Sequence, residues 1–203
     1  MNATTFWNVI GAYNQATIFA QCFLLLLLFT SVILALREKW ITAPKLMLGI
    51  CNLFIGIIFE LKFGTDPIQK YFAAPLFIVI GILFLYEGIR YPKDKFNQFG
   101  KAEIFLLILT LCYPLISCLL GHYFPKMVLY IMPCPLICFS LLIYSRYQRK
   151  NKLLLLLMTI WGMTGIKSLF FHVMEDTILF ILGIYGIYLI LKEIRKKKGE
   201  SVT

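Results

Sequence analysis

Long apolar stretches alternate with short polar breaks along the chain, and this pattern predicts transmembrane helices. A helix needs about 20 residues to cross roughly 30 Å of hydrocarbon, and a window of that length finds seven candidate spans. They lie at 16–36, 43–63, 72–90, 102–121, 126–145, 152–171 and 176–193. The second is weakened by Lys45 and Glu60 near its ends, and the sixth by Lys167 inside it. Six spans with one re-entrant segment is the alternative.

The composition supports this interpretation. The chain has 203 residues, of which 60% are hydrophobic and only 15% charged, as in a polytopic membrane protein. We therefore predict an all-α helical bundle forming a single integral membrane domain over residues 1–203. The opening residues MNATTFWNVIGAYNQ contain no basic side chain, unlike a cleaved signal peptide, so we expect the first helix to be retained.

Charge then predicts the orientation. Most of the 20 Lys and Arg residues follow the first, third, fifth or seventh span. The positive-inside rule places these segments in the cytoplasm, with the N-terminus outside and a basic tail at 192–203 inside. The net charge of +10 is explained by this topology and by anionic membrane lipids, without a nucleic-acid partner.

The ionisable residues able to form a buried site are predicted near the outer face, where such residues are costly and usually functional. They are Glu60, His122, His172, Glu175 and Asp176. By contrast, Glu87 and Glu103 lie at cytoplasmic helix ends beside basic neighbours, and we expect them to face only headgroups.

The segment 121–135, GHYFPKMVLYIMPCP, is the most distinctive of the chain. Pro133 and Pro135 flank Cys134, remove two helix donors and disfavour helical geometry just before each proline. We expect the fifth span to be kinked or broken here. Carbonyl groups freed in this way can line a binding site in a transporter. A packing kink without a ligand is the alternative.

Two further hypotheses concern metal and proton chemistry. Cys118 with His122, and Cys134 with Cys138, are spaced four apart and share helical faces that could hold Cu(I) or Zn(II). Buried cysteine is also ordinary packing, and no CxxC or HExxH motif occurs, so we predict no metal and keep these four residues as weak candidates. No cofactor fingerprint is present either, and we expect no cofactor.

Glu175 and Asp176 precede the last span, where acids can cap the exposed amides of a helix N-terminus. The alternative is a proton or ion relay at the outer mouth. Its members would be Asp176, His172, Lys167 and His122.

Three groups of residues carry a family resemblance. The first is Phe6, Trp7, Ala12, Tyr13, Asn14, Ala16, Ala20 and Gln21. The second and most specific is Gly121, His122, Pro125, Pro133, Cys134 and Pro135. The third is Trp161, Gly165, Glu175 and Asp176. In these the chain resembles the bacterial integral membrane proteins grouped as domain of unknown function 6064, which implies a bacterial cytoplasmic membrane location. It departs from them at Glu60, where the family commonly has histidine, and at Leu136 and Ile137, which replace hydroxyl residues.

Two functional classes remain. The first is a small transporter, channel or solute- or ion-binding membrane protein with a site in the outer half of the bilayer. Its candidate residues are His122, Pro133, Cys134, Pro135, Glu60, His172, Glu175, Asp176, Asn14 and Gln21. The second is a non-catalytic membrane subunit that binds a membrane protein partner or a second copy. A polar cavity reaching Cys134 would favour the first, and a filled interior with a flat face of small residues would favour the second. An enzyme is less favoured, because the spacing specifies no reaction.

Overall fold

The computed structural model describes residues 3–168 and 173–200, and this part of the chain is helical without any strand. The helices are α1 (Ala3–Leu36), α2 (Ala43–Phe54), α3 (Ala74–Arg90), α4 (Lys101–Leu111), α5 (Tyr113–Leu119), α6 (Pro133–Ser145), α7 (Lys152–Met163) and α9 (Thr177–Glu200). A π-helical segment, Ile55–Phe63, continues α2, and another, Gln69–Ala73, leads into α3. Short 3-10 turns follow α7 at Thr164–Lys167 and precede α9 at Met174–Asp176.

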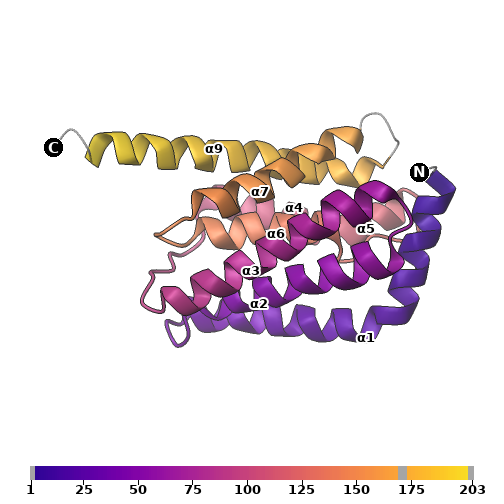
Figure 1. Ribbon diagram of the computed structural model, residues 1–203, viewed down its shortest axis with the longest axis horizontal. Helices are drawn as coiled ribbons and strands as arrows, with labels where there is room; N and C mark the ends of the chain where they lie inside the picture. Colours follow the sequence, from indigo (N-terminus) through magenta and orange to yellow (C-terminus); the bar gives the residue numbers. More distant parts are fainter. Residues whose placement is uncertain (1–2, 169–172, 201–203) are drawn as a thin grey trace.

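Most of the helices run along one axis, with their connections at the two ends (Figure 1). The connections after α1, α3 and α6 lie at the end toward which the C-terminus points, and the N-terminus lies at the opposite end. The basic connections of the sequence are therefore gathered at one end of the bundle. We call this the basic end, and the end with the N-terminus the N-terminal end.

Several helices are long and apolar enough to cross a membrane. In the described residues four pass this test: Thr4–Leu36, Ala43–Phe63, Gln69–Arg90 and Met174–Arg195. Helices α4 and α5 pass it only together, with a bend of 45° between them, and the number is five if this pair is one broken span rather than a re-entrant loop. The all-helical class is thus confirmed, whereas seven crossings remain a prediction.

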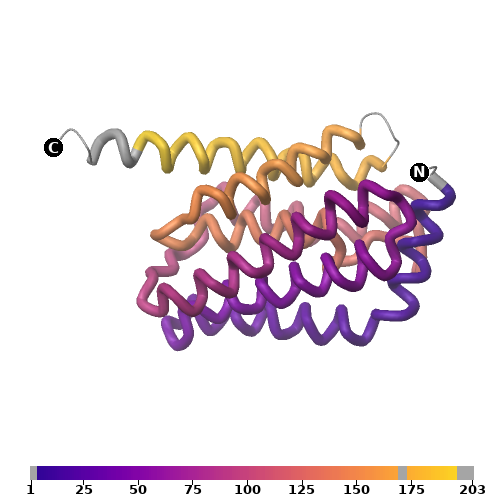
Figure 2. The backbone as a smooth tube through the Cα atoms, in the orientation of Figure 1, coloured from indigo at the N-terminus to yellow at the C-terminus, as the bar shows by residue number. Residues whose placement is uncertain are grey.

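Helix α1 is longer than the predicted span 16–36, because it begins at Ala3. The backbone tube shows that its first turns run across the N-terminal end before the helix bends and joins the bundle (Figure 2). The Thr17 hydroxyl donates to the Tyr13 carbonyl (2.7 Å), a type of bond that bends helices. The extra length places the N-terminal turns over the end of the bundle.

The proline pair starts a helix rather than kinking one. Residues 126–132 are not helical, and α6 begins at Pro133 after Met132, whose backbone is extended (φ −134°, ψ 160°). Proline is favoured in a first helical turn because its missing N–H has no partner to lose there. The expected helix over 126–145 is therefore wrong for its first seven residues, and the expected break lies at its start.

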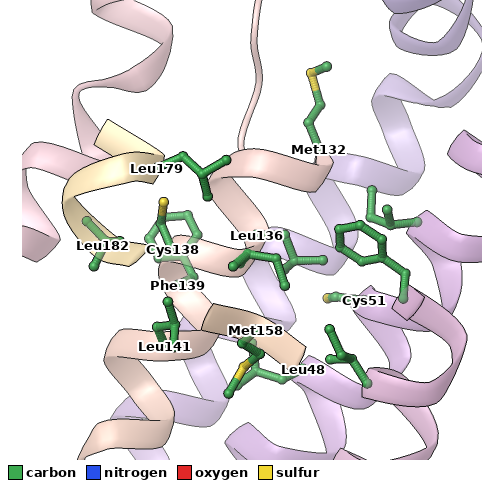
Figure 3. Packing of buried hydrophobic residues seen from close by; sticks show 14 of the residues in the cluster. Leu48, Cys51, Met132, Leu136, Cys138, Phe139, Leu141, Met158, Leu179 and Leu182 are labelled. Carbon is green, nitrogen blue, oxygen red and sulfur yellow. The ribbon is translucent and has the colours of Figure 1, made fainter. Parts of the chain in front are cut away.

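Helix α6 is the centre of the bundle. All its side chains from Pro135 to Ser145 are buried, and they pack against α2, α7 and α9 (Figure 3). The labelled residues of this core are Leu48, Cys51, Met132, Leu136, Cys138, Phe139, Leu141, Met158, Leu179 and Leu182. A helix of 13 residues surrounded by protein can stop short of the bilayer faces, because irregular backbone at membrane depth is tolerated where protein covers it.

Glycines let two helix pairs approach closely. A Cβ atom placed on Gly49 of α2 would lie 3.0 Å from the carbonyl oxygen of Gly81 in α3. One placed on Gly162 of α7 would lie 2.8 Å from the Cα atom of Gly183 in α9. Small residues at such crossings permit backbone contact in membrane helices. The glycines of these pairs thus form contacts between helices of the same chain.

The sides of the bundle expose large apolar side chains. Phe19 on α1 is 90% exposed and Ile89 on α3 is 73% exposed. Such surfaces are unusual for a protein surrounded by water and fit contact with lipid.

Candidate functional site

The helical turns of α1 that cross the N-terminal end hold the irregular segment 121–132. The Asn14 amide donates to the carbonyls of Pro125 (2.7 Å) and Met127 (2.8 Å). The Tyr13 hydroxyl donates to the carbonyl of Ile131 (2.7 Å). Buried backbone carbonyls need partners, and here side chains supply what a helix would otherwise provide. Two of the sequence motifs, far apart along the chain, therefore meet.

Gln21, which lies further along α1, supports the side chain of Asn14. Its amide donates to the Asn14 side-chain oxygen (3.1 Å) and to the Thr17 hydroxyl (3.0 Å). Gln21 and Asn14 are both almost fully buried. In this arrangement the two residues position the segment that carries His122.

His122 pairs with Glu175 at the start of the last helical span. The imidazole Nδ1 lies 2.8 Å from the Glu175 Oε1. The Ser117 hydroxyl of α5 donates to the same oxygen (3.0 Å) and accepts the Val128 N–H (3.1 Å). The Trp7 ring from α1 lies against the imidazole, with ring centroids 3.7 Å apart. Three parts of the chain, the start of α1, the segment 117–128 and the turn before α9, thus meet at the His122–Glu175 pair.

The burial of this pair is uneven. The Glu175 side chain is fully buried, and its second oxygen, Oε2, has no hydrogen-bond partner in the described structure. The His122 side chain keeps 26% of its surface exposed. A buried carboxylate with an unoccupied oxygen, beside an imidazole that reaches the surface, can exchange a proton or receive a cation.

Glu175 does not cap a helix as expected. It lies in the turn Met174–Asp176 ahead of α9, and its carboxylate bonds to Ser117 and His122 instead. Its neighbour Asp176 interacts electrostatically with Cys134 and Lys167. Of the hypothetical relay, His122 thus pairs with Glu175 rather than with Asp176. His172 lies outside the described residues.

Glu60 adds another buried acid to the site candidates. It is 1% exposed, lies in the π-helical segment Ile55–Phe63, and its Oε2 has no hydrogen-bond partner in the described structure. It lies close enough to Cys134 to interact electrostatically. Segments of π-helix occur frequently at functional sites. Glu60 and Asp176 thus both interact electrostatically with Cys134, and Glu175 pairs with His122.

The motifs that meet at this end also identify the family. The model of a family of unknown function, DUF6064, matches residues 3–201. The chain belongs to this family. Neither the curated proteins nor the solved structures contained a significant match. Of the residues that carried the family resemblance, Trp7 and Glu175 contact His122, and Asn14 contacts Pro125.

The weak metal candidates of this DUF6064 member do not assemble into a ligand set. Within the described ranges, no three His, Cys, Asp or Glu side chains lie together as a metal ion requires. All six cysteines are free thiols. Cys134 interacts electrostatically with Asp176, and Cys138 is buried in the core.

A cavity of about 680 Å³ lies away from these residues. Its lining consists of the 90–95 loop with Gln148 and Arg149, all at the basic end. None of the predicted site residues lines it. The cavity expected to reach Cys134 is thus not this one.

One cluster at the basic end was missed in the sequence. Lys45 is fully buried, and its Nζ lies 3.1 Å from Glu87 Oε2 and 2.8 Å from Asp94 Oδ2. The Tyr144 hydroxyl also donates to Glu87 (3.3 Å). The expectation that Glu87 faces only headgroups is wrong, as is the expectation that buried ionisable sites lie only near the outer face. The sequence did contain a signal for this cluster, because Lys45 and Glu87 carry opposite charges and lie in neighbouring apolar spans.

Glu103, which was also expected to face only headgroups, instead contacts other helices. Its Oε1 lies 2.7 Å from the Arg146 guanidinium and accepts a hydrogen bond from the Tyr185 hydroxyl (3.1 Å). The carboxylate therefore links α4 to the end of α6 and to α9 rather than facing headgroups alone.

Proposed function

We propose that this protein is a multi-pass membrane protein that binds and transports a small cation or a proton at the N-terminal end of its bundle. In this proposal the chain crosses the bacterial cytoplasmic membrane seven times, with the N-terminus outside and residues 192–203 as a cytoplasmic tail. The gathering of the basic connections at one end supports this orientation. The long apolar helices and their exposed apolar faces support the membrane location.

The Glu175 carboxylate carries the proposal. Burying an ionised group costs several kcal/mol unless partners compensate it. Only one oxygen of this carboxylate is engaged, by Ser117 and His122, and the other is left buried without a partner. A cation or a proton on Oε2 would complete the site, and His122 connects it to the outer surface.

Glu60 and Asp176 add two further acids to the proposed site. Both interact with the Cys134 thiol, which lies on the first turn of α6. A cation that reaches Glu175 would therefore find further acids around Cys134. Asn14 and Gln21 act as positioning residues, because they fix the backbone on which His122 and Cys134 lie.

The accessory-subunit alternative has less support. It requires a flat face of small residues for a partner helix. Gly49 with Gly81, and Gly162 with Gly183, are instead occupied in contacts within the chain.

Flux through the purified full-length protein in liposomes tests the proposal. Trapped dyes for pH and for monovalent or divalent cations would report movement after an imposed gradient. We expect flux several-fold above empty liposomes for the wild type, and loss of that increase in Glu175→Gln. Glu38→Gln, a change of an exposed glutamate at the basic end, is the matched control and keeps the wild-type flux. A wild type no more permeable than empty liposomes for every cation tested would overturn the proposal.

A further inference from the structure

The cavity at the basic end has the size and charge of an anion site. Its volume of about 680 Å³ lies within the range of small-molecule sites. Four of its lining residues are cations, namely Arg90, Lys93, Lys95 and Arg149. In the part of the chain that the structure describes, no ion pair to an acid occupies any of the four.

The single acid of the lining is already occupied. Asp94 is buried, and its Oδ2 lies 2.8 Å from the buried Lys45 ammonium. Its other oxygen accepts the backbone N–H groups of Lys95 (2.9 Å) and Arg149 (3.3 Å). The carboxylate is thus engaged by its own protein. The positive charge of the lining remains available to a ligand.

The two walls of the cavity are fixed to each other. The Gln148 N–H donates to the Lys95 carbonyl (3.0 Å), and Phe96 pairs with Tyr147 in an isolated antiparallel bridge. The Arg149 guanidinium lies over the Tyr91 ring, 5.2 Å from its centroid. Because Asp94 also joins both walls, the backbone that carries the cations is fixed before any ligand arrives, which lowers the entropy lost on binding.

We propose that this cavity binds a phosphate-bearing anion, and that the headgroup of an anionic phospholipid is its main source. Arg and Lys side chains recognise phosphate through charge-assisted hydrogen bonds. The cavity lies at the end of α3, which is apolar and of membrane-spanning length. In the membrane arrangement proposed above, on which this step rests, the cavity is at headgroup depth. Basic pockets on the cytoplasmic side of membrane helices bind such headgroups. This site is independent of the one at Glu175.

The test compares two double variants of the full-length protein that remove the same charge from the same end. Lys93→Gln with Lys95→Gln removes two lining cations. Lys39→Gln with Lys152→Gln removes two exposed lysines that do not line the cavity. Retention of phosphatidylglycerol over phosphatidylcholine by the purified proteins would be measured by native mass spectrometry, and binding of inorganic pyrophosphate by calorimetry in detergent.

We expect the lining variant to retain phosphatidylglycerol on the order of tenfold more weakly than the wild type, and the control variant to match the wild type. Equal weakening in both variants would overturn the cavity site, because the effect would then belong to general surface charge. Pyrophosphate binding that only the lining variant loses, with lipid retention unchanged, would support the phosphate site and assign it to a soluble ligand. No preference for phosphatidylglycerol and no pyrophosphate binding in the wild type would overturn the proposal entirely.

Discussion

The Nδ1 atom of His122 lies 2.8 Å from the Oε1 of Glu175, although the two residues are 53 positions apart in the chain. One partner is fully buried and the other reaches the surface. This pair is the point at which the irregular segment before α6, the end of α5 and the start of the last span meet. Changes around it should therefore affect both stability and the proposed ion binding.

Ser117 links the Glu175 carboxylate to the segment before α6. Ser117→Ala removes the donor to Glu175 and the acceptor of the Val128 N–H together. We expect a loss of about 1–3 kcal/mol of stability, because buried polar groups are left unpaired, measured as a lower thermal unfolding temperature in detergent. Ser31→Ala is the control, since the buried Ser31 hydroxyl bonds only within its own helix. Equal effects of the two changes would contradict the account.

Asn14 should govern the order of the segment it holds. Asn14→Ala leaves the carbonyls of Pro125 and Met127 without their donor. We expect faster hydrogen exchange and proteolysis over 121–132 and a loss of about 1–3 kcal/mol. Asn8→Ala, at an exposed position of the same helix, should change neither. Unaltered exchange in Asn14→Ala would show that the segment is held by other contacts.

The buried ion cluster at the basic end makes a stronger prediction. Lys45→Met leaves Glu87 and Asp94 buried beside each other without their cation. Removing one partner of a buried ion pair costs about 3–5 kcal/mol, so the folded yield should fall sharply. Adding Glu87→Gln and Asp94→Asn to Lys45→Met should recover much of it, because no uncompensated charge then remains. Lys39→Met, at an exposed site, is the control. A triple variant no better than Lys45→Met would contradict this account.

The close helix pairs should not tolerate a methyl group. Gly81→Ala would place its Cβ 2.9 Å from the Gly49 carbonyl oxygen, so α2 and α3 must separate. We expect a loss of about 1–3 kcal/mol from overpacking, detected by thermal unfolding. Val79→Leu enlarges a side chain on the exposed face of the same helix and should have little effect. Equal stability of Gly81→Ala and the wild type would show that the crossing adjusts without cost.

Hydrophobic periodicity and proline chemistry predicted the helical class and the interruption near Pro133 correctly, because both act locally along the chain. These patterns did not predict that the helix begins at Pro133. Proline lacks an N–H group, and this property both interrupts an existing helix and suits the first turn of a new one. The choice depends on Tyr13 and Asn14, which supply donors to carbonyls more than 100 residues away. Pairing over such distances leaves no local pattern.

The same reasoning explains the charged residues. His122, Glu175 and Cys134 could be singled out because ionisable and sulfur side chains are conspicuous among apolar ones. The pairing of His122 with Glu175, and that of Lys45 with Glu87, depend on how neighbouring helices are rotated. The rotation of neighbouring helices relative to each other cannot be predicted from a single sequence.

Labelling of Cys134 in intact cells would test the central claim most directly. The other cysteines, Cys22, Cys51, Cys112, Cys118 and Cys138, would be replaced, and folding and insertion verified. A site open to the outside through His122 predicts that a membrane-impermeant thiol reagent modifies Cys134 from the external side, and that Trp7→Ala, which uncovers the imidazole, accelerates the reaction. Modification only from the cytoplasmic side, or none in a folded and inserted protein, would contradict the account.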